Sequence, residues 1–373
     1  MSEKKEKINR IIINSKTVIS DALKKMDQEN VKLLLILDDE KFTSVLSIGD
    51  IQRAIIKDIP LESVVGNILR KKIVVAHVDD DFSRIKEKMF KYRAECMPVL
   101  DDNNNLVDVY FWEDVFLEKE PIRQDKIKLP VVIMAGGKGT RLRPITNVIP
   151  KPLIPLSQKP IVQVIMDSFK KIGVNQFFLS VNYKYKMIEY YFNDISEDQY
   201  NIEYFKEDKP LGTAGSLYLI KDKIKNTFFV TNCDILIDQD YRDIYNFHIE
   251  NNNDITIVGA IKQYQIPYGT LEIGKNSNLK ALKEKPELTF FVNTGMYILE
   301  KGVLDYIPEG NFFHMTDLIE EVIDKGRKVG VFPVSERSWM DIGEWNEYQK
   351  TLVQFEKKFY RHSSKKTKFA NRG

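Results

Sequence analysis

The feature that most restricts the fold is a regular alternation of short apolar strands with amphipathic helices, which begins at Pro130. The predicted strands are rich in β-branched and aromatic residues and lie at Val131–Ala135, Gln176–Val181, Thr227–Thr231 and Ile255–Ile261. Helices are predicted between them at Pro160–Ile172, Lys186–Ile195, Thr213–Lys223 and Tyr241–Glu250. Such alternation predicts an α/β domain with a mostly parallel sheet that is covered on both faces. Ligands of these sheets bind at the carboxyl ends of the strands.

The first 120 residues contain an internal repeat, in which a helix, a strand, an acidic turn, a second strand and another helix recur. The acidic turns at Asp38 and Asp101 are 63 residues apart, and the helix starts at Asp50 and Asp114 are 64 residues apart. A pattern that recurs at a constant interval indicates two structural repeats. We therefore expect a smaller α/β domain at 1–120, a charged linker at 121–129, the main domain at 130–352 and a basic tail at 353–373.

Charge and cysteine content exclude several classes of protein. The chain has 56 Lys and Arg against 54 Asp and Glu, so its net charge gives no reason to expect a nucleic acid partner. Cys96 and Cys233 are far apart and lack metal-ligand spacing, which argues against a disulfide framework or a zinc site. No apolar run approaches the roughly 18 residues of a membrane span, and no signal peptide is visible. We therefore expect a cytoplasmic protein without a membrane partner.

A glycine-rich loop follows the first strand of the main domain and reads Ala135-Gly136-Gly137-Lys138-Gly139-Thr140-Arg141. Glycines allow backbone N–H groups to approach phosphate oxygens closely, because no Cβ intervenes. The loop is not a dinucleotide fingerprint, since Leu142 stands where a third glycine is needed, and no Ser or Thr follows Lys138 as in a Walker A loop. Arg141 and Arg143 beside the loop suit a triphosphate. A tight turn with incidental surface arginines is the alternative.

With these residues the chain resembles the sugar nucleotidyltransferase family, whose hallmark is GGxGTRL, a proline and then a Lys-Pro pair, here Pro150-Lys151-Pro152-Leu153. Further motifs of the family follow in the expected order over about residues 130–350. They are Lys209-Pro210-Leu211-Gly212-Thr213-Ala214-Gly215, Asn232-Cys233-Asp234, Pro267-Tyr268-Gly269, Glu284-Lys285-Pro286, Asn293-Thr294-Gly295 and Trp339-Met340-Asp341-Ile342-Gly343. The resemblance implies the nucleotidyltransferase fold, with a Rossmann-like sheet. Asn232 departs from the glycine of many relatives.

The resemblance implies that a sugar 1-phosphate oxygen attacks the α-phosphorus of a nucleoside triphosphate and that pyrophosphate leaves. Such a reaction needs no protein nucleophile and relies on positioning and charge stabilisation. Arg141 and Lys151 are the expected catalytic residues, which would stabilise negative charge on the phosphates. Asp234 and Asp341 are the expected Mg²⁺ ligands, because this ion needs only one or two carboxylates beside the phosphates. A turn cap before Gly343 is the alternative role for Asp341.

The resemblance also assigns residues that contact the two substrates. The nucleotide is expected to contact Ala135, Gly136, Gly137, Gly139, Thr140, Arg141, Glu207, Asp208, Pro210, Gly212 and Thr213. The sugar phosphate is expected to contact Tyr268, Gly269, Glu284, Lys285, Asn293 and Thr294. The expected partners are therefore a nucleoside triphosphate and a sugar 1-phosphate, with Mg²⁺ as the cofactor.

The repeat in the first 120 residues is similar to a tandem CBS pair, a family in which Ser/Thr-x-x-Asp at the last helix often holds a nucleotide ribose. The first copy keeps this motif as Ser47 and Asp50, whereas the second has Phe111 ahead of Asp114, where the hydroxyl belongs. The resemblance implies a regulatory nucleotide as ligand, and we also expect the pair to support a homo-oligomer. Helix capping by the two aspartates is the alternative.

Glu207 and Asp208 favour GTP as the donor, because guanine presents N1–H and the N2 amino group side by side and one carboxylate accepts both. Uracil and thymine present a single donor between two acceptors, and these acids could instead solvate a surface turn. The fusion to a CBS pair resembles the glucosamine-1-phosphate guanylyltransferases of bacterial legionaminic acid synthesis, which implies a role in surface-glycan or nonulosonic acid synthesis. Mannose 1-phosphate, heptose 1-phosphate, UTP and dTTP stay open as substrates.

An alternative from another class is a non-catalytic, nucleotide-sensing regulatory subunit. Subunits of that kind typically lose the arginine, the lysine or the metal-binding aspartates of the transferase. All of these residues, Arg141, Lys151, Asp234 and Asp341, are present here. The sequence therefore favours an active transferase.

Overall fold

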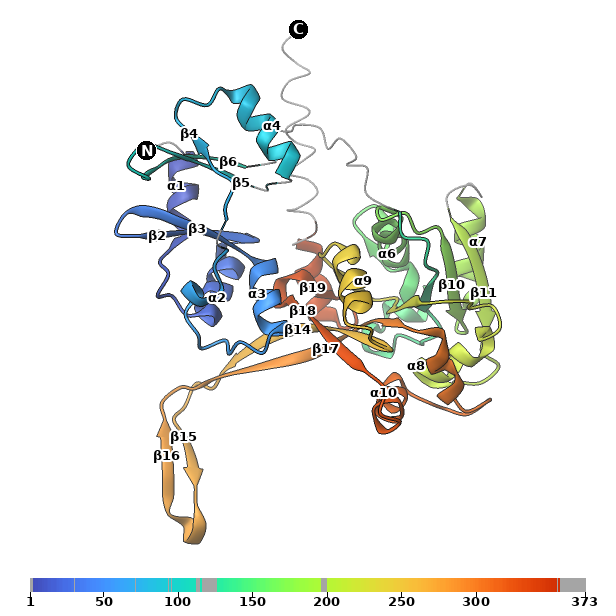
Figure 1. The fold of residues 1–373 in the computed structure, drawn as a ribbon. Helices are drawn as coiled ribbons and strands as arrows, with labels where there is room; N and C mark the ends of the chain where they lie inside the picture. Colours follow the sequence, from blue (N-terminus) through green and yellow to red (C-terminus); the bar gives the residue numbers. More distant parts are fainter. Residues whose placement is uncertain are drawn as a thin grey trace. The chain divides into compact units, whose positions relative to one another are not determined.

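The computed structural model describes residues 3–29, 31–70, 72–92, 94, 96–111, 115, 126–195, 200–353 and 355. The chain divides into two compact units, Met1–Arg123 and Gln124–Gly373 (Figure 1). Asp114, most of the expected linker and the basic tail beyond Phe355 lie outside the described residues. Within the described part of the chain, no helix is both long enough and apolar enough to cross a membrane.

The first unit contains both copies of the repeat, each built on a three-stranded sheet with the orders β1-β2-β3 and β4-β5-β6. In each sheet the first strand is parallel and the third antiparallel to the central strand. The elements are α1 (Glu3–Arg10), β1 (Ile12–Ile13), α2 (Ile19–Glu29), β2 (Leu33–Asp38), β3 (Lys41–Ser47), α3 (Ile48–Ile56), β4 (Ala76–His77), α4 (Phe82–Tyr92), β5 (Cys96–Leu100) and β6 (Leu106–Phe111). The two copies are joined where the Phe42 N–H donates to the Asn104 carbonyl at 3.1 Å.

The second unit is built on a seven-stranded sheet with the order β11-β10-β7-β12-β17-β14-β18. Strands β7, β10, β11 and β12 are parallel, β17 runs antiparallel between β12 and β14, and β18 is parallel to β14. The strands of this sheet are β7 (Val131–Met134), β10 (Gln176–Val181), β11 (Asn201–Lys206), β12 (Phe228–Asn232), β14 (Ile255–Gln265), β17 (Glu287–Leu299) and β18 (Val329–Ser335). Three short pairs join β8 (Pro155–Leu156) to β9 (Lys159–Pro160), β13 (Ile235–Ile237) to β19 (Trp339–Asp341), and β15 (Thr270–Ile273) to β16 (Leu279–Lys283).

Helices cover both faces of this sheet (Figure 1). They are α6 (Ile161–Lys170), α7 (Tyr185–Asp194), α8 (Gly212–Gly215), α9 (Tyr241–Glu250) and α10 (Met315–Asp324). In β7, Val131 and Ile133 belong to one buried cluster with Phe169 of α6, whereas Val132 belongs to another with Leu318 of α10. Successive strand residues point to opposite faces, so the fully apolar β7 is stable only between two helical layers. The predicted α/β class with a mostly parallel sheet is confirmed.

The segment predicted as a helix at Thr213–Lys223 departs most from its prediction. Helix α8 ends at Gly215, and a 3₁₀ helix follows over Ser216–Ile220. A Cβ on Gly215 would lie only 2.6 Å from the Asn311 carbonyl oxygen, so close backbone packing shapes this segment. Strand β17, which brings antiparallel pairing into the sheet, has no counterpart among the predicted strands.

Candidate active site

The glycine-rich loop leaves the carboxyl end of β7, between the parallel neighbours β10 and β12. The Ala135 N–H donates to the Ser180 carbonyl of β10 at 2.9 Å, which holds the start of the loop against the sheet. Gly139 has a φ of +63°, and a Cβ there would lie 2.8 Å from Cγ2 of Thr146. The Thr146 hydroxyl also donates to the Gly139 carbonyl at 2.8 Å. Backbone angle and packing therefore both require glycine at position 139, whereas space surrounds Gly137.

The two predicted metal-binding aspartates are brought together by the short strands β13 and β19. These strands pair with Ile235 opposite Asp341, and the Ile342 N–H donates to the Asp234 carbonyl at 2.8 Å. The Gly343 N–H donates to Oδ1 of Asp341 at 2.6 Å. This bond is the turn cap that was the alternative role for Asp341, and it uses one of the two carboxylate oxygens. Capping and metal binding are therefore compatible here.

Gly343 marks the point at which the predicted site residues converge. A Cβ on Gly343 would lie 2.8 Å from Oδ2 of Asp234, 2.8 Å from Oδ1 of Asp341 and 3.6 Å from Nη2 of Arg141. A Cβ at this position would therefore displace one or both carboxylates. Arg141 also forms an ion pair with Glu344 at 3.1 Å, in which both side chains are exposed. Residues from three distant segments thus meet at one place.

Lys151 completes this cluster through an ion pair with Asp234. The Lys151 ammonium contacts Oδ2 of Asp234, and the two side chains are only 13% and 11% exposed. Burial, together with the nearby charge of Asp234, raises the pKa of the Asp341 carboxyl, and the Gly343 N–H acts in the opposite direction. A buried cation is needed here because two neighbouring carboxylates repel each other in a poorly solvated place.

Cys233 stands between the strand β12 and Asp234 and is buried. Burial raises the pKa of its thiol to about 12, so the side chain stays protonated at physiological pH. A protonated, buried thiol packs as a small apolar group and is a poor nucleophile. The cluster therefore contains cations and carboxylates but no activated cysteine.

Glu207 is buried beside the glycine-rich loop. Its Oε1 accepts a hydrogen bond from the Ser180 hydroxyl at 2.6 Å, and its Oε2 accepts one from the Leu211 N–H at 3.1 Å. A Cβ on Gly136 would lie 3.1 Å from the same Oε1, so the carboxylate lies directly against the loop. The reading of Glu207 as part of a solvated surface turn is therefore wrong, while the neighbouring Asp208 and Pro210 are exposed.

The glycine-containing motif at residues 209–215 packs against the segment that precedes α10. Gly212 has a φ of +80°, and a Cβ there would lie 2.5 Å from the Phe313 carbonyl oxygen. The Thr213 hydroxyl oxygen accepts a hydrogen bond from the Met315 N–H at 2.9 Å, at the first turn of α10. Both residues thus hold the loop in place, and their contact with a nucleotide stays a prediction.

The predicted sugar-phosphate residues fall into two places. Asn293 and Thr294 lie in β17, where Oδ1 of Asn293 accepts from the Gly295 N–H at 2.9 Å and the buried Thr294 hydroxyl donates to the Val258 carbonyl at 2.8 Å. The other four lie in an arm, residues 262–291, which extends from β14 and β17 and ends in the β15–β16 hairpin (Figure 1). They are Tyr268, Gly269, Glu284 and Lys285. A Cβ on Gly269 would lie 2.9 Å from Oε2 of Glu284, so the two turns lie against each other. The β15–β16 hairpin of the arm lies apart from β19, the strand that carries Asp341 (Figure 1).

In the first unit, Ser47 and Asp50 form a capping box at the N-terminus of α3. The Asp50 N–H donates to the Ser47 hydroxyl at 3.3 Å, and the Ser47 N–H donates to Oδ2 of Asp50 at 2.9 Å. The carboxylate, which is 5% exposed, also pairs with Arg53 at 2.5 Å and with Arg70 at 2.6 Å. Burial opposes ionisation, but hydrogen bonds from Arg70 and Ser47 hold the pKa of Asp50 below its usual value. The capping alternative is therefore present in the first copy.

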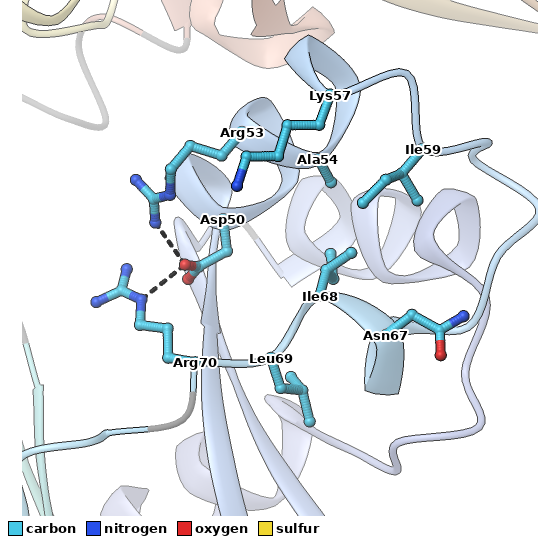
Figure 2. A pocket seen from close by; sticks show the side chains of 9 residues that line it. All are labelled: Asp50, Arg53, Ala54, Lys57, Ile59, Asn67, Ile68, Leu69 and Arg70. Carbon is cyan, nitrogen blue, oxygen red and sulfur yellow. Dashed lines mark hydrogen bonds and ion pairs between the residues drawn. The ribbon is translucent and has the colours of Figure 1, made fainter.

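A pocket of about 540 Å³ opens beside this ion-pair cluster (Figure 2). The lining residues are Asp50, Arg53, Ala54, Lys57, Ile59, Asn67, Ile68, Leu69 and Arg70. Three of them are basic and three are large aliphatic residues, a combination that suits an anionic ligand with an apolar ring. The pocket thus offers charge to a phosphate and apolar surface to a base.

Comparison with known proteins identifies both units. The nucleotidyl transferase family matches residues 130–358, which is more than half of the chain. The chain belongs to this family. The CBS domain matches residues 7–57 and 65–118, which confirms the tandem pair in the first unit of this nucleotidyl transferase.

Two curated relatives share the nucleotidyl transferase region. A UTP–glucose-1-phosphate uridylyltransferase from Synechocystis sp. is 32% identical over 244 residues, which cover 60% of this chain and 62% of the relative. A mannose-1-phosphate guanylyltransferase from Mycobacterium tuberculosis is 33% identical over 186 residues, which cover 49% of this chain and 52% of the relative. The matches therefore span between one half and two thirds of the length of these relatives. Because the two names specify different bases, membership of the family does not fix the base.

A solved structure shares the fold of this nucleotidyl transferase. It is a candidate glucose-1-phosphate thymidylyltransferase from Bacillus anthracis, determined in complex with sucrose. The TM-score is 0.50 at 21% identity, with 61% of this chain and 95% of that chain covered. At this identity the likeness establishes the fold alone.

The carboxylates of this nucleotidyl transferase fit a magnesium ion. Asp234 and Asp341 both present hard oxygen donors close to Gly343. Magnesium typically takes one or two protein carboxylates and completes its shell with substrate phosphates and water. Among the residues described, no three His, Cys, Asp or Glu side chains are grouped to hold a metal. The pair therefore fits an ion shared with a phosphate, not one enclosed by protein.

Several residues that build these sites were not among the sequence predictions. Ser180 and Glu344 contact Glu207 and Arg141, respectively. In the CBS pair, Arg53 and Arg70 contact Asp50. Glu344 directly follows a family motif and could have been included on that ground. Arg70 lies 20 residues beyond Asp50, and no local pattern in the sequence connects the two.

Proposed function

We propose that this protein transfers a nucleotidyl group, GMP from GTP, to a sugar 1-phosphate and releases pyrophosphate. The observation that carries the proposal is the convergence of Arg141, Lys151, Asp234 and Asp341 around Gly343. The cluster lies beyond the carboxyl ends of β7 and β12, where ligands of parallel sheets bind. The neighbouring glycine-rich loop supplies backbone N–H groups for phosphate oxygens.

The charges of the cluster suit phosphoryl chemistry. The sugar phosphate oxygen forms a bond to the α-phosphorus as the bond to the pyrophosphate oxygen breaks, so negative charge builds on the phosphates. Lys151 is held in place by its ion pair with Asp234, and its ammonium is available to this charge. Arg141 also lies near Gly343 and is more exposed than Lys151, which suits the leaving pyrophosphate. A magnesium ion bound to Asp234 and Asp341 would neutralise further phosphate charge.

Glu207 supports guanine as the base. Its carboxylate is fixed at the glycine-rich loop by the Ser180 hydroxyl and the Leu211 N–H. Each carboxylate oxygen can accept more than one hydrogen bond, so both can also accept from the N1–H and N2 groups of a guanine. The guanylyltransferase named among the relatives agrees with this choice, and the uridylyltransferase keeps UTP as the alternative.

For the acceptor we propose glucosamine 1-phosphate, with the product entering surface-glycan or nonulosonic (legionaminic) acid synthesis. The support is the combination of a nucleotidyl transferase domain with two CBS domains. No residue of the described site distinguishes an amino sugar from mannose 1-phosphate or heptose 1-phosphate. The mannose-1-phosphate enzyme among the relatives makes mannose the first alternative.

Pyrophosphate release tests these proposals directly. The purified protein with magnesium is incubated with GTP, UTP, dTTP, CTP or ATP and, in turn, with glucosamine, mannose, heptose and glucose 1-phosphates. We expect release with GTP that depends on the sugar phosphate and stops in excess chelator. A preference for UTP or dTTP would reject the base but not the reaction. No release with any pair would reject the reaction and favour a regulatory subunit.

A second function, nucleotide binding by the CBS pair, is favoured by the pocket beside Asp50. Arg53, Lys57 and Arg70 supply positive charge, and Ile59 and Leu69 supply apolar surface (Figure 2). We propose a purine nucleotide as the ligand. Calorimetric titration with ATP, AMP, GTP and GDP should show binding that Arg70→Ala weakens about tenfold or more, because a charged hydrogen bond is lost. If Arg70→Ala and the wild type bound the nucleotide with equal affinity, this pocket would be excluded as the binding site.

A further inference from the structure

Ser180, near the carboxyl end of β10, contacts two parts of the candidate nucleotide site. Its carbonyl oxygen accepts a hydrogen bond at 2.9 Å from the N–H of Ala135, the residue at which the glycine-rich loop begins. Its hydroxyl group belongs to a fully buried side chain and donates to Oε1 of Glu207 at 2.6 Å. Ser180 therefore connects the glycine-rich loop to the acidic side chain beside it.

The backbone of Glu207 is held by the same segment of the chain, independently of the Ser180 hydroxyl. The Glu207 N–H donates to the Val181 carbonyl at 3.3 Å, and the Asn182 side-chain amide donates to the Glu207 carbonyl at 2.9 Å. The Leu211 N–H donates to the second carboxylate oxygen, Oε2, at 3.1 Å. Loss of the Ser180 hydroxyl would therefore leave Glu207 in place and release only one oxygen of its carboxylate.

The Glu207 carboxylate is buried and has spare capacity for hydrogen bonds. Among the residues that the structure describes, it accepts a hydrogen bond on each oxygen but forms no ion pair with a Lys, Arg or His. An ionised carboxylate accepts about four hydrogen bonds, and a buried charge costs free energy unless it is paired and hydrogen-bonded. The site therefore suits a ligand that brings two adjacent N–H donors, and the edge of a guanine has this arrangement.

We infer that Ser180 is a positioning residue for the base and that it sets the preference for guanine. This inference rests on the proposed reaction with GTP, in which Glu207 accepts from the N1–H and the N2 amino group. The terminal torsion of a glutamate side chain has broad energy minima, so a carboxylate with a single donor can turn. Donors on both oxygens, from Ser180 and from the Leu211 N–H, fix the plane of the carboxylate. A fixed plane allows both oxygens to accept from the two donors of one guanine at once.

The preference for GTP over inosine triphosphate (ITP) tests this role, because ITP keeps the N1–H but lacks the N2 amino group. Pyrophosphate release at a saturating concentration of the accepted sugar 1-phosphate gives kcat/KM for each nucleotide. For the wild type we expect a GTP-to-ITP ratio of about ten or more, since ITP loses one hydrogen bond to a charged group. Ser180→Ala should lower this ratio to about two or less through a higher KM for GTP, while kcat stays within about a factor of two.

Two further comparisons separate positioning from a general effect on the fold. Glu207→Gln replaces one acceptor oxygen by an amide and should also lower the ratio, and Ser180→Ala in this variant should then have no further effect. The matched control, Thr256→Val, removes another buried hydroxyl of the same sheet, which contacts His248 at 2.8 Å and Asn253 at 3.0 Å. This control should lower the melting temperature without a change in the ratio. Both nucleotides act on the same protein sample, so a loss of folded protein cancels from the ratio.

A Ser180→Ala variant with the wild-type ratio, or a wild type that uses GTP and ITP equally well, would overturn the inference. The same would follow if Ser180→Ala lowered the ratio equally with and without Glu207→Gln, because Ser180 would then not act through Glu207. A preference of the wild type for UTP would overturn the inference together with the choice of base, but not the reaction.

A wild type that releases no pyrophosphate with any nucleotide would reject the proposed reaction instead. The dissociation constants of GTP and ITP then test the positioning role alone. Calorimetric titration gives them in an Arg70→Ala background, which weakens binding at the pocket of the CBS pair. Ser180→Ala should again reduce the preference for GTP, and an unchanged preference would overturn the inference.

Discussion

The aspartate cluster and the arm both contain motifs of the nucleotidyl transferase family, but the fold positions them in different ways. Asp234 and Asp341 lie on short paired strands next to β12, and the central sheet determines where they meet. Glu284 and Lys285 lie in a turn of the arm, beyond the last pairs of the β14–β17 ladder. Residues at strand ends of the sheet converge because of topology. Residues on the arm reach the substrate only if a conformation or an assembly places them there.

The largest effect is expected in the cluster, where Asp234→Ala or Asp341→Ala should lower turnover by on the order of a hundredfold or more. Under the proposed function, either change removes a carboxylate that would hold Mg²⁺, the ion whose charge would offset the negative charge on the reacting phosphates. Pyrophosphate release at saturating substrates is the measurement, and Asp222→Ala is the control for loss of an exposed aspartate. Full turnover in Asp234→Ala would show that the cluster takes no part in the reaction. The proposed difference in function between the cluster and the arm would then be wrong.

The arm is expected to affect substrate binding and not turnover. Lys285→Ala should raise KM for the sugar 1-phosphate about tenfold, since a charge-assisted hydrogen bond to phosphate is worth roughly 1.4 kcal/mol or more. KM for GTP and kcat should stay within about a factor of two. Lys283→Ala removes an exposed lysine from the same arm and is the matched control. Equal KM values in the two variants would show that Lys285 does not reach the substrate.

The α/β class and the parallel strands of the sheet could be predicted from the sequence, because the periods of strands and helices are local properties. The convergence of Asp234 and Asp341 followed from family motifs, and the structure explains it by the β13–β19 pair. The antiparallel strand β17 and the arm could not be predicted in this way. Pairing between residues such as Gln265 and Glu287 is non-local, and the apolar alternation of a hairpin resembles that of a buried strand.

Glu207 shows a different limit of sequence reasoning. Its type and place near the glycine loop were predicted, but its burial was not. The burial depends on the Ser180 hydroxyl from β10, which lies 27 residues earlier in the chain. In the same way, Arg53 and Arg70 pair with Asp50 only because the fold brings these segments together. Charge partners that are distant in sequence leave no periodic pattern.

Removal of residues 1–122 tests whether the aspartate cluster and the arm of the second unit function without the CBS pair. The second unit has its own sheet and buried clusters, so the truncated protein should fold and keep turnover within about a factor of three. It should lose any response of activity or assembly to adenine or guanine nucleotides. Circular dichroism, pyrophosphate release and light scattering are the measurements. If the truncated protein kept both the oligomeric state and the nucleotide response of the full-length protein, the CBS pair would have no role in assembly or in nucleotide sensing.

The smallest effect concerns His248 of α9, which contacts the start of β14 and the residue after β17. The imidazole is 1% exposed and contacts the Thr256 hydroxyl of β14 at 2.8 Å and Glu300, just beyond β17, at 3.1 Å. Burial lowers the pKa of this histidine, although Glu300 acts in the opposite direction. Below pH of about 6.5 the unfolded chain therefore binds a proton more readily than the native protein, and the free energy of unfolding falls as pH decreases.

We expect this stability to be complete above pH of about 6.5 and to be lost progressively as the pH falls towards the lowered pKa of the native state. Between pH 7.5 and 5.5 the wild type should lose about 1 kcal/mol more unfolding free energy than His248→Gln, which cannot titrate. Urea unfolding at several pH values gives this difference, and His77→Gln, at an exposed histidine, is the control. Parallel pH profiles for the wild type and His248→Gln would mean that this histidine accepts a proton without loss of native packing. The start of β14 would then tolerate a charge on His248 without loss of its pairing with β17.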